Sequence, residues 1–85
     1  MTTDDLLAQR ATTHGSFKSN AQIGQSLRAL FRRHEAWPGM PVEHREALDM
    51  IACKISRILS GQSDYQDNWA DIAGYAELAR KACER

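Results

Sequence analysis

Residues 42–60 read VEHREALDMIACKISRILS and hold the clearest hydrophobic pattern in the chain. At about 100° per residue, the aliphatic side chains of this segment gather within about 60° of one line along a helix. These residues are Leu48, Ile51, Ala52, Ile55, Ile58 and Leu59. Pro41 suits the start of such a helix and Gly61 suits its end. The pattern predicts a helix from Val42 to Ser60 with one face in the core.

A second long helix is predicted from Asp67 to Cys83. Its expected buried seam contains Ile72, Ala76, Ala79 and Cys83, with Trp69 and Ala73 beside it. The polar linker at 62–66 is short, so this helix and the one before it should form an antiparallel pair. Gly74 inside a helix costs about 1 kcal/mol relative to alanine. We therefore expect another helix or a ligand to approach the backbone closely there.

An earlier helix is predicted to begin between Ser16 and Asn20, which are good N-caps. Phe17 should then sit just outside it as an apolar anchor for the preceding turn. The expected buried face contains Ile23, Leu27, Leu30 and Phe31. The sequence WPGMP at 37–41 ends this helix, because two prolines and a glycine do not continue one.

A short helix is predicted at the N-terminus, capped by Thr2 or Thr3 and ended by residues 12–15. No β-type alternation of useful length occurs. The fold class is therefore all-α: one domain over residues 1–85, a small helical bundle of three main helices plus the short N-terminal helix. A single core is marginal at 85 residues, so we also expect an oligomer.

The charge balance limits the partners. Eleven basic and eleven acidic residues give no net charge, which argues against non-specific nucleic-acid binding but leaves room for a local basic site. No segment has the roughly 20 apolar residues of a membrane span, and no signal peptide is recognisable. Cys53 and Cys83 are expected to be buried free thiols in the cytoplasm.

One candidate site is basic. Lys54 and Arg57 stand three residues apart on the polar side of the 42–60 helix and could meet one anion together. Equally, they could pair with acids on the facing helix. Met50 and Cys53 lie on the same side, which suggests that the N-terminal segment or a second subunit covers it.

A second candidate site is acidic. Asp67 and Asp71 are one helical turn apart, with Asn68 and Tyr75 nearby. Two such carboxylates can share a divalent cation. They can also accept from Lys54 and Arg57 across the antiparallel pair, as a structural ion-pair network.

Acids at every third position, Glu43, Glu46 and Asp49, extend this pattern. Together with Asn68 and Asp71, they resemble the MazG-like all-α nucleotide pyrophosphohydrolases, whose EExxE and ExxD motifs hold Mg²⁺ against substrate phosphates. The resemblance implies a metal site of Glu46, Asp49 and Asp71. The chain departs from the family pattern where the double Glu is missing and where Asn68 replaces a carboxylate.

From Gly15 onward the chain resembles a family of small phage and prophage proteins of unknown function. The matching segments are 15–17, 20–21, Ile23, Trp37, 45–51, 54–55, 57–61 and 67–76, and the last ends in the sequence DIAGYA. The resemblance implies a phage-related protein in the cytoplasm of an infected or lysogenic bacterial host. It implies no particular activity.

Three functions follow. The first is a module that binds a nucleotide or nucleotide-derived signal: Lys54 and Arg57 would hold phosphate, Trp69 or Tyr75 would stack on a base, and Asn20 or Asn68 would read its edge. Phages encode small helical proteins that sequester the nucleotide signals of host defence, so the resemblance favours an anti-defence sponge. The second is a Mg²⁺-dependent MazG-like enzyme, and the third is a protein-interaction domain without a small ligand.

Overall fold

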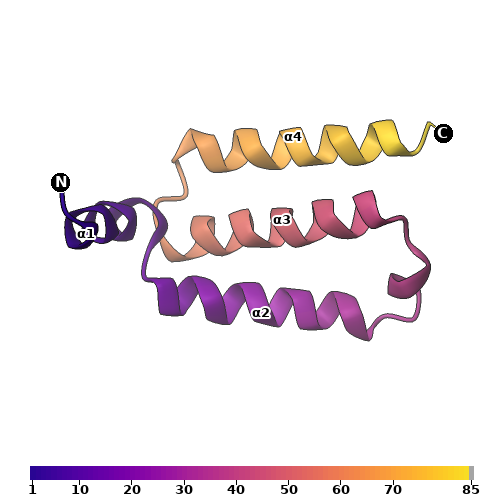
Figure 1. Cartoon of the computed structure of the whole chain (residues 1–85), viewed down its shortest axis with the longest axis horizontal. Coiled ribbons are helices and arrows are strands. Elements are labelled where there is room, and N and C mark those ends of the chain that lie inside the picture. The colour runs from indigo at the N-terminus through magenta and orange to yellow at the C-terminus, as the bar shows by residue number, and fades with distance from the viewer. Residues whose placement is uncertain (85) are drawn as a thin grey trace.

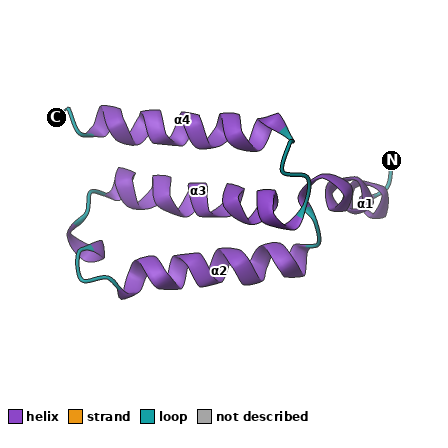
Figure 2. Ribbon diagram, turned by 180° about the vertical axis from the view of Figure 1, so that it is seen from behind, coloured by secondary structure: helices purple, strands orange, loops and turns teal. Residues whose placement is uncertain are grey.

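The computed structural model describes residues 1–84, and all the regular secondary structure over that range is helical. Its elements are α1 Thr3–His14, α2 Phe17–Arg33, α3 Val42–Ser60 and α4 Gln66–Ala82, with a 3₁₀ turn, η1, at Trp37–Gly39. Figure 2 shows these helices joined by short loops. The all-α prediction is confirmed. Among residues 1–84, none of the helices combines the length and the apolar character needed to span a bilayer.

The three long helices lie in one layer. Figure 1 shows α3 between α2 and α4, each antiparallel to it, and α1 at the end of the layer where α2 and α4 begin and α3 ends. The molecule measures 44 × 25 × 22 Å. The predicted antiparallel pairing of the last two helices is confirmed. The central helix α3 packs against both α2 and α4.

Local capping fixes where the first two helices start. The N–H of Asp5 donates to Oγ1 of Thr2 over 3.1 Å, while the N–H of Thr2 donates back to the Asp5 carboxylate over 3.0 Å. Ser16 caps α2 by accepting from the N–H of Ser19 over 3.1 Å. The reciprocal pair at Thr2 and the single bond at Ser16 satisfy N–H groups that a helix start otherwise leaves unpaired.

The tightly packed part of the core is small. The buried apolar side chains are Trp37, Ala47 and Ala52. The Trp37 ring stacks on Phe31 with centroids 5.8 Å apart, and the Arg32 guanidinium lies 4.9 Å from the Trp37 ring centroid. Arg32 also holds both carboxylate oxygens of Asp49, at 3.0 and 2.7 Å. This cluster fixes the turn between α2 and α3.

The three predicted buried faces are each partly wrong. Leu30 on α2 and Leu59 on α3 are 54% and 68% exposed, whereas the other residues of these two predicted faces are buried or half-buried. On α4, Ala76 and Cys83 are exposed. The residues of α4 that face α3 are Asn68, Ile72, Tyr75, Ala79 and Ala82.

Three further expectations are corrected. Phe17 is the first residue of α2 rather than an anchor outside it, and its side chain is 85% exposed. A Cβ at Gly74 would meet no atom within 4 Å, so no other helix approaches the backbone closely there, and the approach of a ligand stays a prediction. Of the two free cysteines, Cys83 is exposed and Cys53 is half-buried.

Candidate functional site

The C-terminal ends of α1 and α3 meet in a tight backbone junction. Gly15 has φ +79°, a conformation that side chains disfavour, and a Cβ there would overlap the backbone of Ser60. A Cβ at Gly61 would stand 2.6 Å from backbone atoms of His14. The hydroxyls of Ser19 and Ser60 are 2.6 Å apart and add a link from α2. The two glycines thus let three helices approach at one point.

A pocket of about 650 Å³ opens beside this junction, between α1, α2 and α3. Its cationic side chains are Arg10 from α1, Arg28 from α2 and Arg57 from α3. The other lining residues are Leu7, Ala11, His14, Gly15, Phe17, Asn20, Ala21, Gly24, Gln25, Cys53 and Ser56. No carboxylate lines it, so the described residues give the pocket a positive potential.

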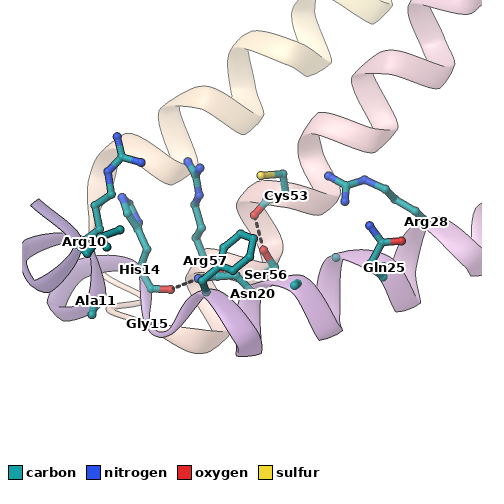
Figure 3. Close-up of a pocket in the computed structure, with 14 residues that line it drawn as sticks. Arg10, Ala11, His14, Gly15, Asn20, Gln25, Arg28, Cys53, Ser56 and Arg57 are labelled. Carbon is teal, nitrogen blue, oxygen red and sulfur yellow. Dashed lines mark hydrogen bonds between the residues drawn. The ribbon is translucent and has the colours of Figure 1, made fainter. Parts of the chain in front are cut away.

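The three guanidinium groups come to the pocket from three different helices. Figure 3 shows Arg10, His14 and Arg57 extending the same way, while Arg28 approaches from α2. The Arg28 guanidinium lies over Gly24, where a Cβ would be 3.3 Å from its Nη1. Within residues 1–84, none of these three arginines has a salt-bridge partner within 4.0 Å.

His14 lies among these cations. Burial, followed by the charges of Arg57, Lys54 and Arg10, lowers the pKa of His14 below its ordinary value of 6.5. Its ring meets Tyr65 edge-on at 5.4 Å. Burial is the larger cause of this shift, and the neighbouring cations add to it.

Asn20 lines the pocket and bonds to the turn between α1 and α2. Its Nδ2 donates to the carbonyl oxygens of His14 at 2.8 Å and Ser16 at 3.0 Å. Its Oδ1 is buried and has no hydrogen-bond partner among the described residues. The same holds for Nδ1 of His14. Neither atom is accessible to solvent, and a buried polar atom without a partner is unusual in a folded protein.

Of the predicted ligand-binding residues, the structure brings Asn20 and Arg57 together in this pocket. Lys54 instead forms a salt bridge of 2.9 Å to Asp71 across α3 and α4, which is the structural pairing weighed above. Asn68 is 1% exposed in the contact with α3. Trp69 is 54% exposed and donates from Nε1 to the carbonyl oxygen of Ser63 over 2.7 Å.

Tyr75 lies on α4 in a different groove, shared with Glu46. The predicted metal ligands Glu46, Asp49 and Asp71 are separated, since Asp49 pairs with Arg32 and Asp71 with Lys54. Among residues 1–84, no cluster of three or more His, Cys, Asp or Glu side chains could hold a metal ion. The residues of the MazG-like metal site are thus present but not gathered.

The sequence analysis missed Arg10, His14, Phe17 and Arg28 as site residues. The signal was in their spacing: Phe17, Ala21, Gly24 and Arg28 follow one another at helical spacing along one face of α2. That face carries a glycine and an arginine where a core helix would carry large apolar residues. The α1 residues could not be placed, because their position depends on the junction.

Residues 2–83 match the family described as a domain of unknown function, DUF6378. The chain belongs to this family. None of the curated proteins and none of the solved structures compared with it shows a significant match. The family assignment supports the predicted resemblance to an uncharacterised family. The DUF6378 region includes every helix and the whole pocket lined by Arg10, Arg28 and Arg57, which we call the arginine pocket.

Proposed function

We propose that this DUF6378 domain binds a phosphorylated, nucleotide-type small molecule in the arginine pocket. The observation that carries the proposal is the convergence of Arg10, Arg28 and Arg57 from three helices on one pocket without a carboxylate. Its volume of about 650 Å³ is also in the range of small-molecule sites, about 300–1,000 Å³.

Phosphate is the group that best matches the three arginines. A guanidinium presents paired N–H donors that fit two phosphate oxygens, and it remains charged at any physiological pH. Three such groups from different sides suit a ligand with more than one phosphate charge. The pocket also adjoins the first turn of α2, where the helix dipole is positive.

The remaining lining suits a base and a sugar. Phe17 combines 85% exposure with a place in the pocket wall, so its ring is free to stack on a base. Asn20 lines the pocket, and its buried Oδ1 would accept a hydrogen bond from a ribose hydroxyl or an exocyclic amine once the ligand turned this side chain toward it. In this proposal Phe17 takes the stacking role that the sequence suggested for Trp69 or Tyr75.

The pocket favours holding the ligand over converting it. Its lining has no carboxylate to activate water or to bind Mg²⁺, and two of the three acids expected to do so, Asp49 and Asp71, are engaged in ion pairs. Sequestration of a nucleotide signal, including the anti-defence role suggested by the phage resemblance, is consistent with such a site.

The first experiment is to incubate the protein with a panel of nucleotides and cyclic nucleotides, with and without Mg²⁺. The protein is then separated and denatured, and the released small molecules are identified by mass spectrometry. We expect one ligand to be recovered intact. Recovery of hydrolysed products would contradict a pure binding role, and recovery of nothing would contradict the proposal itself.

Variants then test the site. Arg57→Ala should weaken binding more than about tenfold, because a charged hydrogen-bond pair is lost. Arg33→Ala is the matched control: it removes an exposed arginine of α2 that does not line the pocket. Equal affinities of the two variants by calorimetry would place the ligand elsewhere.

A further inference from the structure

The side of the helical layer opposite the arginine pocket is aliphatic. On α3, Ile55 and Leu59 each follow a pocket residue by two positions, Cys53 and Arg57. Two residues turn a helix by about 200°, so these side chains point away from the pocket. We call the following residues the apolar face: Ile23, Leu27, Leu30, Leu48, Ile55 and Leu59.

The α2 part of the apolar face follows the same geometry. Leu30 comes two residues after the pocket residue Arg28. Leu30 and Leu59 are 54% and 68% exposed, and the other four side chains of the apolar face are only half-buried. No residue of this face carries a charge. The pocket side differs, since it holds Arg10, Arg28 and Arg57.

The chain exposes more surface than a folded monomer of its mass should. A monomer of 9.6 kDa is expected to expose about 5,100 Å². This chain exposes 6067 Å². Its radius of gyration is 14.6 Å, against about 12 Å for a compact chain of this length. The excess of about 1,000 Å² compares with the roughly 800 Å² that each partner buries in a stable interface of standard size.

We infer that the apolar face binds the same face of a second copy of this chain. A two-fold contact pairs one patch with itself, so a charged patch would oppose like charges. The apolar face avoids that repulsion because it carries none, and the chain as a whole has zero formal charge. Burying aliphatic side chains from both copies completes the core that one layer leaves open.

This mode of association leaves the arginine pockets open on the two outer sides of the dimer. The sequence analysis expected the N-terminal segment or a second subunit to cover the side of α3 that carries Cys53. Residues of α1 lie on that side, beside the pocket, and the proposed dimer contact uses the opposite side of α3. Cys53 itself lines the pocket.

The test is the mass in solution, measured by light scattering or sedimentation from about 1 to about 100 µM, the range in which interfaces of modest affinity dissociate. We expect a species of at least two chains. A 9.6 kDa monomer at the highest concentration would overturn the inference.

Exposed positions supply variants that keep the fold, which circular dichroism checks. Leu59→Glu and Leu30→Glu each place a carboxylate in the contact and should raise the dissociation constant more than about tenfold. Leu78→Glu is the matched control, because Leu78 is 62% exposed and lies in the groove on the pocket side. Dissociation by Leu78→Glu, with Leu59→Glu and Leu30→Glu still associated, would also overturn the inference.

Discussion

The backbone N–H of Gln62 donates to the carbonyl oxygen of Thr13 over 2.9 Å. This bond joins residues 49 positions apart and ties the last turn of α1 to the chain leaving α3. With Gly15 and Gly61 beside it, it sets the position of α1 and therefore of Arg10 and His14. The shape of the pocket thus depends on a backbone contact rather than on side-chain packing.

Gly61→Ala is expected to destabilise the protein by about 1–3 kcal/mol, because the new Cβ overlaps the backbone of α1. Chemical denaturation measures the change. Gly74→Ala is the control, since its Cβ meets no atom within 4 Å, and it should stabilise α4 by about 0.5–1 kcal/mol. Equal effects of the two substitutions would show that the junction is not tight.

Lys54 and Asp71 are expected to stabilise the contact between α3 and α4. The Lys54 side chain is only 12% exposed, so Asp71→Ala leaves a largely buried ammonium without its partner, at a cost of about 1–2 kcal/mol. Lys54→Met in the same background should recover part of that loss. A double-mutant cycle measures the coupling. If Mg²⁺ stabilised the wild type and not Asp71→Ala, Asp71 would be a metal ligand instead.

Stability is expected to fall as the pH drops below about 6.5. The pKa of His14 is lowered in the fold, so the unfolded chain takes up its proton first and is favoured by acid. Above about 6.5 both states are neutral at this residue, and the contribution is constant. Thermal or denaturant unfolding from about pH 8 to pH 5 measures this slope. His14→Gln should flatten it, and an unchanged slope would exclude His14 as its source.

Ligand affinity should change with pH in the opposite direction. An anion beside His14 offsets the positive charges of Arg10 and Arg57, so binding raises the pKa of this histidine and takes up a proton. Affinity is therefore expected to rise as the pH falls through the range in which His14 titrates. Calorimetry in buffers of different ionisation enthalpy measures the proton uptake, and proton release on binding would contradict the prediction.

Binding is expected to weaken as ionic strength increases, because three arginines supply the attraction. The dissociation constant should rise steadily with added salt. Arg28→Ala should reduce both the affinity and its dependence on salt, since one charge is lost. An affinity that salt does not change would point to a ligand held by apolar contacts alone.

Much of the fold follows from the sequence. The predicted α3 ends coincide with Val42–Ser60, and the predicted α4 is displaced by one residue from Gln66–Ala82. Caps, prolines and helical periodicity are local signals, so they set these ends well. Which part of a helix face is covered depends on tertiary packing, which is not a local signal. Leu59 lies two turns after Ala52 on the same side of α3, yet Ala52 is fully buried and Leu59 is 68% exposed, so periodicity alone does not say how far along a face the cover extends.

Less of the candidate site could be predicted. Arg57 and Asn20 were identified from their residue type and position, and both line the pocket. Lys54 has the same chemistry, but its place toward α4 gives it Asp71 as a partner. Arg10 and Arg28 come together with Arg57 only through the junction at Gly15 and Gly61. A contact between residues this distant in sequence leaves no periodic signal.

The attachment of α1 has an energetic consequence. None of its residues is fully buried, and it is held mainly at its last turn, although it supplies Arg10 and His14 to the pocket wall. A helix with so few buried contacts opens locally at a much lower free energy than the whole domain. The cost of ordering α1 is then part of every binding event, and an occupied pocket should protect the α1 amide hydrogens from exchange with solvent.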